Sequence, residues 1–117
     1  MTKSGRINYI EMPAADLEAT KAFYGKALGW TFEDYGPDYT AFNDGSFDGG
    51  FFKADLSSST ANGAALVVLY ADDLEALQET LQEHGARICR EIFPFPGGRR
   101  FHFLDPNNNE LAVWSDK

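Results

Sequence analysis

Apolar and polar positions follow the same order twice along this chain. An apolar, strand-like run at residues 7–12 precedes a helical pattern that begins at Asp16. A second apolar run at residues 64–70 precedes a helical pattern that begins at Asp73, and its leucines recur at i, i+3 and i+7. Strand-like runs followed by amphipathic helices predict a mixed structure of strands and helices.

A short motif supports this internal repetition. Residues 14–19 read AADLEA, and residues 71–76, fifty-seven positions later, read ADDLEA. Each helical pattern then ends near a glycine, Gly29 in the first copy and Gly85 in the second. Because several features recur in the same order, the sequence indicates two copies of one supersecondary unit.

Turn signals divide each copy into one strand, one helix and three further strands. Gly36-Pro37-Asp38 and Asn43-Asp44-Gly45 mark turns in the first copy, and Asp105-Pro106 marks one in the second. The hairpins favour largely antiparallel sheets with the helices on one side, which is the α+β class. The expected strands are 6–12, 30–35, 39–43, 49–54, 64–70, 87–93, 99–104 and 110–114, and the expected helices are 16–28 and 73–85.

A chain of 117 residues fits one compact domain, here residues 1–117. Within it, we expect module one at about 5–56 and module two at about 64–115. Residues 57–63, SSSTANG, form a polar linker of flexible composition between them. The two modules are expected to share one core, because a unit of about 60 residues is marginal by itself.

Composition narrows the possible ligands. Hydrophobic residues make up 44% and aromatic residues 15%, and ten phenylalanines predict a wide apolar interior or interface. The net charge is −8, and apart from Arg99-Arg100 the basic residues are dispersed. This argues against nucleic-acid binding, which depends on phosphate neutralisation. It is compatible with a neutral or cationic small molecule.

The cysteine count, the length of the apolar runs and the first residues bear on the cellular location. The chain has one cysteine, Cys89, so no internal disulfide is possible, and we expect a buried, inert thiol. No apolar run approaches the roughly 18 residues needed to span a bilayer, so no membrane partner is expected. Residues 1–5 lack the apolar stretch of a signal peptide, and a cytoplasmic location is the default expectation.

Three stretches carry a resemblance to a known family. Residues 16–18, 22–24 and 28–30 (DLE, AFY and LGW) are similar to the first helix of the vicinal-oxygen-chelate superfamily. That superfamily includes glyoxalases, extradiol dioxygenases and bleomycin-resistance proteins. Residues 103–109, FLDPNNN, resemble its Asp-Pro-x-Gly-Asn turn, with Asn108 in the glycine position. Asn tolerates a left-handed backbone, so this departure is mild. The resemblance implies two βαβββ modules, sheets that curve around a cleft, and a homodimer.

The resemblance also implies where a metal would bind. In metal-dependent members, the first and last strands of each module supply up to four ligands. The corresponding positions here are Tyr9, Leu66, Ala112 and a residue in the range 51–55, where Asp55 is the one carboxylate. Leucine and alanine cannot donate, and neutral tyrosine is a poor ligand. We therefore expect neither a metal nor another cofactor.

The same positions predict a cleft. Strand alternation puts Glu11 on the face of Tyr9, so the two residues are candidate ligand contacts. Glu11 has a second interpretation, as a structural residue that either pairs with an arginine such as Arg87 or Arg100 or lies at the solvent edge. Leu66, Ala112 and Phe52 are further lining candidates, and Phe52 equally suits a dimer interface.

Two more candidates come from the last strands. His102 lies between two phenylalanines and is a possible general base or ligand contact, although a lone strand histidine is often structural. Trp114 shares a strand face with Ala112 and suits either a cleft wall or the core. His84, at the end of a helix, is explained by the helix dipole.

Two function classes follow. The first is a glyoxalase- or bleomycin-resistance-like protein that binds a small organic molecule in an apolar, aromatic cleft without a metal. The alternative is a lyase, isomerase or dioxygenase of the same superfamily, with displaced metal ligands or with His102 or Glu11 as a metal-free base. Proton abstraction beside a carbonyl needs preorganised donors or a metal to stabilise the enolate. The sequence contains no evident set of this kind, so it favours binding.

Overall fold

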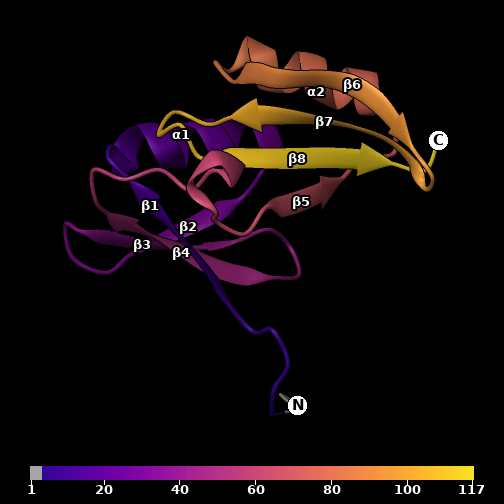
Figure 1. Cartoon of the computed structure of the whole chain (residues 1–117). Coiled ribbons are helices and arrows are strands. Elements are labelled where there is room, and N and C mark those ends of the chain that lie inside the picture. Colours follow the sequence, from indigo (N-terminus) through magenta and orange to yellow (C-terminus); the bar gives the residue numbers. More distant parts are fainter. Residues whose placement is uncertain (1–3) are drawn as a thin grey trace.

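A computed structural model describes residues 4–117, so the sequence-based expectation for residues 1–3 lies outside the described range. The chain folds into two four-stranded sheets and two α-helices (Figure 1). Neither helix in the described range is long and apolar enough to cross a bilayer. The elements are β1 Ile10–Ala14, α1 Leu17–Leu28, β2 Thr31–Asp34, β3 Tyr39–Asn43, β4 Asp48–Lys53, the 3-10 helix η1 Thr60–Asn62, β5 Val67–Tyr70, α2 Leu74–Glu83, β6 Arg87–Phe95, β7 Gly98–Leu104 and β8 Glu110–Ser115.

The two sheets have the same topology. Sheet A has the strand order β1-β4-β3-β2, and sheet B has the order β5-β8-β7-β6. The first strand of each module runs parallel to the last strand, and the remaining pairs are antiparallel. The predicted α+β class and the two βαβββ modules are therefore confirmed.

Both helices begin as the sequence predicts. The side chains of Asp16 and Asp73 accept hydrogen bonds from the amides three residues later, each at 3.0 Å. These N-caps satisfy amides that have no partner within the helix. Gly29 ends α1 with a φ of 73°, a left-handed conformation that glycine adopts without strain.

Two strands continue through a proline beyond the end that the sequence predicts. The first strand was expected at 6–12 but occupies Ile10–Ala14 and includes Pro13. The predicted loop at 95–98 was also too long, because β6 continues through Pro94 to Phe95. Both strands lie at sheet edges, where the missing amide hydrogen of proline costs no ladder bond. A third expected strand, at 64–70, begins only at Val67.

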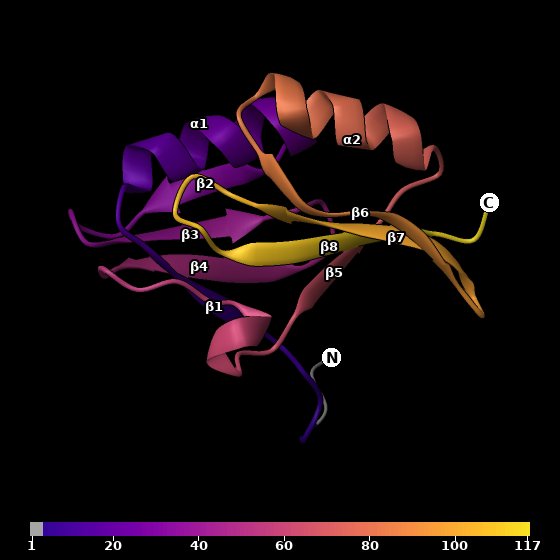
Figure 2. The same cartoon turned by 45° about the horizontal axis from the view of Figure 1, so that its top comes forward.

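The core lies between the sheets and the helices. Figure 2 shows α1 and α2 on the same side of the two sheets, with α1 over sheet A and α2 over sheet B. The rings of Tyr24, Trp30 and Phe42 stack with centroid distances of 4.6 and 4.5 Å. Phe101 and Phe103 supply the corresponding buried face of sheet B. The opposite face of each sheet, turned away from the helices, does not belong to this core and is available for binding.

A buried polar cluster connects the two modules. Asp105, in the turn between β7 and β8, is only 3% exposed. Its carboxylate accepts hydrogen bonds from the Tyr24 hydroxyl at 2.7 Å, from the amides of Asn107 and Asn109 at 2.8 and 2.9 Å, and from the Asn109 side chain at 3.2 Å. Burial raises the pKa of Asp105, whereas these donors act in the opposite direction. The carboxylate is thereby joined to α1 of the other module.

Asn109 extends this cluster in two directions. Its fully buried side chain donates to the Pro13 carbonyl at 2.7 Å and accepts from the Ser58 amide at 2.8 Å. One side chain therefore contacts β1, the linker and the Asp105 turn. Asn107 makes a parallel connection, because its amide group donates to the Thr20 hydroxyl at 2.7 Å.

Replacement of Asn109 by alanine should leave buried donors and acceptors on both modules without partners. We expect Asn109→Ala to lower the free energy of unfolding by about 2–4 kcal/mol. Asn8→Ala, at an exposed position, is the matched control and should change it by less than about 0.5 kcal/mol. Urea unfolding followed by circular dichroism measures both, and equal effects would contradict the role assigned to Asn109.

Candidate functional site

The predicted cleft residues lie on the sheet faces turned away from the helices, but they form two groups. Tyr9, Glu11 and Phe52 belong to sheet A and the segment before it. The other group belongs to sheet B and the segment before β5, and consists of Leu66, His102, Ala112 and Trp114. Among the described residues, no hydrogen bond or ring contact joins the two groups.

On sheet A, a hydrogen-bonded chain joins Tyr9, Tyr39 and Glu11. The Tyr39 hydroxyl donates to Glu11 Oε2 at 2.8 Å. Since a phenol has one hydrogen, Tyr9 is the donor in the 2.6 Å contact between the two hydroxyl oxygens. Burial, with the hydrogen bonds to Tyr9 and Glu11, raises the pKa of Tyr39 well above its usual value. Tyr39 therefore stays protonated and holds Glu11 in place.

This arrangement excludes the ion pair that was considered for Glu11, and leaves a ligand contact and a solvent-exposed edge position as its interpretations. Its partner is a tyrosine, and neither Arg87 nor Arg100 forms an ion pair with it. Arg87 instead donates to the Asn108 side chain, beside the Asp105 turn. Glu11 remains exposed on its strand, so its carboxylate can also be reached by a ligand.

The strand register identifies the fourth position that the family resemblance implies. In sheet B, Ala112 pairs with Val68. The internal repeat relates Val68 to Glu11. In sheet A, Glu11 pairs with Gly50, so Gly50 corresponds to Ala112. The fourth position is therefore Gly50, one residue before the expected range 51–55. Asp55, the one carboxylate considered there, lies beyond the end of β4.

Gly50 has a clear steric reason to be glycine. A Cβ atom at this position would lie 2.0 Å from the Tyr39 hydroxyl oxygen and 2.9 Å from that of Tyr9. The Tyr39 phenol thus occupies space directly over the Gly50 backbone. No side chain that could bind a metal fits at this position while Tyr39 keeps its place.

The donor set does not suit a metal of this fold. The four metal-ligand positions that the family resemblance implies are occupied by Tyr9, Gly50, Leu66 and Ala112. Only the tyrosine has a side-chain atom that could bind a metal. Within residues 4–117, no three His, Cys, Asp or Glu side chains form a group that could hold a metal ion. Divalent metals need several converging donors, so these residues do not fit the metal that the resemblance implies.

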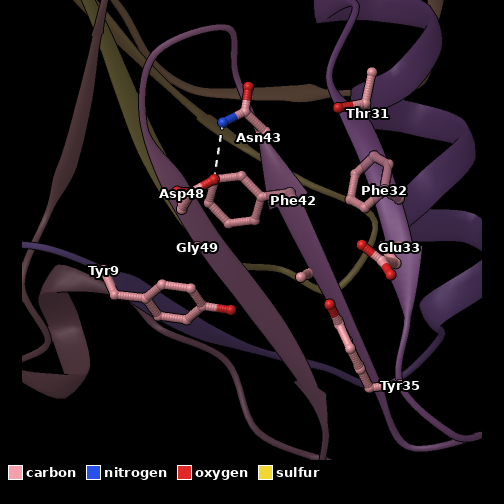
Figure 3. A pocket seen from close by; sticks show the side chains of 10 residues that line it. Tyr9, Thr31, Phe32, Glu33, Tyr35, Phe42, Asn43, Asp48 and Gly49 are labelled. Atoms are coloured by element: carbon pink, nitrogen blue, oxygen red, sulfur yellow. Dashed lines mark hydrogen bonds between the residues drawn. The ribbon is translucent and has the colours of Figure 1, made fainter.

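An open pocket of about 480 Å³ lies on sheet A beside Tyr9. Figure 3 shows the Tyr9 ring on one side and the Glu33 and Tyr35 side chains on the other. The Glu33 carboxylate raises the pKa of Tyr35, and Asn43 donates to Asp48 at 2.8 Å along another edge. The lining residues are Tyr9, Thr31, Phe32, Glu33, Tyr35, Ala41, Phe42, Asn43, Asp48 and Gly49. Among these ten, two are acidic and none is basic.

On sheet B, His102 is paired with Glu110. The imidazole Nδ1 lies 2.7 Å from Glu110 Oε2, and the histidine side chain is 5% exposed. The other carboxylate oxygen, Oε1, accepts from the amide and the hydroxyl of Thr60, at 2.9 and 2.7 Å. Burial alone raises the pKa of Glu110, but the hydrogen bonds from His102 and Thr60 outweigh it and lower that pKa to about 2. Glu110 is therefore ionised at neutral pH and fixes the proton on Nδ1.

The remaining sheet B candidates line or support the same face. Ala112 is fully buried opposite His102. Trp114 packs edge-on against Tyr70 at a centroid distance of 5.2 Å and lies 6.2 Å from Phe95. Trp114 thus belongs to an aromatic surface patch and is only partly buried.

Cys89 and His84 lie outside the predicted cleft, and the sequence made an expectation for each. Cys89 is exposed, so the expected burial was wrong, because β6 is an edge strand with an irregular register around this residue. Desolvation of the thiol and the nearby Glu110 charge raise its pKa, so its thiolate fraction is small. His84 caps the end of α2, as its sequence position predicts.

Sequence reasoning missed Tyr39, Gly50 and Thr60, and it placed Glu110 on the face of Ala112 without its contact to His102. Tyr39 is separated from Glu11 by a helix and a strand, so only the sheet order brings them together. Glu110 lies eight residues from His102 across the Asp105 turn, and hairpin pairing of these strands could have revealed that contact. Thr60 carries no signal in the sequence, because the composition of residues 57–63 predicts a flexible linker.

The chain matches the family model described as Glyoxalase/Bleomycin resistance protein/Dioxygenase superfamily over residues 6–113. Comparison with curated proteins gave no match. A glyoxalase-related enzyme from Fulvimarina pelagi is 18% identical with a TM-score of 0.78, and the alignment covers 95% of this chain and 88% of that one.

A second similar structure is a mutant of the fosfomycin resistance protein FosX from Listeria monocytogenes, complexed with Mn(II) and 1S,2S-dihydroxypropylphosphonic acid. It is 14% identical with a TM-score of 0.79, over 96% of this chain and 90% of that one. At such identities the structures establish a shared fold alone. The family model covers most of the chain, and this protein belongs to the glyoxalase/bleomycin resistance protein/dioxygenase superfamily.

Proposed function

We propose that this protein binds a small cationic organic molecule in the sheet A pocket, without a metal and as a homodimer. The observation that carries the proposal is the Tyr9–Tyr39–Glu11 chain. It occupies the space over Gly50 that a metal ligand would need, and it lies beside a pocket of about 480 Å³. A volume of this size suits a small ligand.

The chemistry of the pocket favours a positive charge. Its aromatic lining includes Tyr9, Tyr35 and Phe32, and its acidic lining consists of Glu33 and Asp48. Aromatic faces attract cations through the ring quadrupole, and the carboxylates add a complementary field. The net charge of −8 acts in the same direction at long range.

Metal content is the first test. We expect purified, dialysed protein to contain well under one bound Ni, Zn, Fe or Mn ion per chain by elemental analysis, because three of the four family positions lack a side-chain donor atom. A stoichiometric transition metal that survives dialysis would contradict metal-free binding.

Ligand binding is the second test, with benzyltrimethylammonium as the probe and calorimetry with and without EDTA as the measurement. We expect binding that EDTA does not change. Glu33→Gln should weaken it about two- to fivefold, as expected for a partly exposed charge worth about 0.5–1 kcal/mol. Glu79→Gln, an equal charge change on the exposed side of α2, should leave the affinity unchanged.

Two results would count against the cationic pocket. The first is absence of probe binding at millimolar concentration. The second is equal weakening by Glu33→Gln and Glu79→Gln, since this would mean that only the overall charge attracts the probe. Turnover of any bound compound would instead favour the lyase, isomerase or dioxygenase alternative.

Exposed apolar side chains support the dimer. Ile7 is 82% exposed and Val68 is 44% exposed. Both line an open, mainly apolar pocket of about 410 Å³ together with residues of sheet A and β5. Apolar surface of this kind, next to an edge strand, is typical of an interface with a partner. A second copy is the partner that the family resemblance implies.

We expect light scattering to give about twice the chain mass of 13.0 kDa at micromolar concentration. Val68→Asp should shift the mass to that of one chain, because it buries a charge in the contact. Leu56→Ser is the control, since Leu56 is 64% exposed and does not line this pocket. A single-chain mass for the unmodified protein would overturn the dimer.

A further inference from the structure

Sheet B presents an arginine- and aromatic-rich face that the proposed function does not use. Arg90 lies on the Phe93 ring, with Cζ 3.8 Å from the ring centroid. Arg100 approaches the same ring at 5.5 Å and the Phe95 ring at 6.0 Å. His102 is also close to Phe93, at 5.9 Å between ring centroids. Three nitrogen-bearing side chains therefore surround one phenylalanine.

Two nitrogen atoms of this group are buried without a partner. Arg100 Nε and His102 Nε2 have no hydrogen bond among the described residues. They belong to positions two apart on β7, so their side chains share one face of the strand. A buried polar atom without a partner costs about 1–3 kcal/mol, so two of them on one face need an explanation.

The nearest carboxylate cannot supply the missing acceptor. Glu110 already uses Oε2 for His102 Nδ1 and Oε1 for Thr60. Arg99 points to the opposite face of β7 and pairs with Glu75. Acidic residues outnumber Lys and Arg by 18 to 10 in this chain, yet no described carboxylate lies within 4.0 Å of Arg90 or Arg100.

The geometry points to a second binding site here, for the carboxylate of an aromatic organic acid. Arg100 and His102 would bind the carboxylate oxygens, and the ligand ring would lie against Phe93, Phe95 and Trp114. A guanidinium presents its N–H groups in a planar fork that matches a carboxylate. Nδ1 is directed to Glu110, and an imidazole that carries a proton on both ring nitrogens donates the Nε2 hydrogen to the same ligand.

Arg90 supplies access and a further positive charge. Its side chain is exposed and stacks on Phe93 at the edge strand β6, so it can rotate without disturbing the core. Rotation opens the Phe93 ring and directs a second guanidinium toward the ligand. This site lies on sheet B and shares no residue with the acidic pocket on sheet A, so it does not depend on the proposed function.

Benzoate is the probe, titrated into the full chain and followed by the imidazole NMR signals of His102 and by calorimetry. We expect saturable binding, with the His102 signals shifted in the bound state. Arg100→Gln should weaken benzoate about tenfold or more, as for a lost charged hydrogen bond of about 1.5–3 kcal/mol. Arg100→Lys should be intermediate, because it keeps the charge but loses the fork.

Arg6→Gln is the matched control, since it removes the same charge from the exposed segment before β1 and should leave benzoate affinity unchanged. Circular dichroism establishes that each variant is folded, and Arg100→Lys tests the site if Arg100→Gln does not fold. Inorganic phosphate should bind at least tenfold more weakly than benzoate, because it has no ring to stack.

Three results would overturn this site. They are absence of saturable benzoate binding, equal weakening by Arg100→Gln and Arg6→Gln, and phosphate affinity equal to that of benzoate. The cation probe, run on the same unmodified protein, separates the two proposals. Cation binding without benzoate binding overturns this inference alone, and benzoate binding without cation binding overturns the proposed function alone.

Discussion

The buried Asp105 carboxylate is the contact on which the arrangement of the two modules depends. It accepts hydrogen bonds from Tyr24 of module one and from Asn107 and Asn109 of its own turn. A buried carboxylate is costly unless donors surround it, and Tyr24 on α1 supplies one of these donors, so the packing of α1 stabilises the turn. The shared apolar core supplies most of the stabilisation. The polar cluster restricts the modules to one relative position, and the two outward sheet faces therefore have a fixed relation.

The two outward faces have diverged although the modules share one topology. At equivalent positions, sheet A has Glu11 and Gly50 where sheet B has Val68 and Ala112. The glycine admits the Tyr39 phenol, which holds the Glu11 carboxylate, and Glu33 and Asp48 add negative charge to the sheet A face. Sheet B instead collects arginine, histidine and aromatic rings around Phe93. A repeated scaffold thus presents two surfaces of opposite charge.

The fold could be predicted from the sequence because its signals are local. Asp16, Asp73 and Gly29 determine the helix ends through bonds to residues a few positions away. The site could be predicted only in part, because its decisive contacts join distant strands. Tyr39 meets Glu11 through the order of sheet A, and no local pattern reveals that a phenol fills the space over Gly50. Pro13 and Pro94 misled for a related reason, since their effect depends on whether the strand is at an edge.

The linker between the modules has a consequence for redesign of this chain. Its composition suggests a dispensable tether, which would be the natural place to cut or permute the protein. Yet Thr60 holds Glu110, which orients His102, and Ser58 binds Asn109 at the junction of the modules. A break or insertion there would remove the support of the His102 side chain on sheet B. It would also remove the contact between Ser58 and Asn109 at the junction of the modules. The segment that looks most replaceable thus connects the two modules and holds a side chain of sheet B in place.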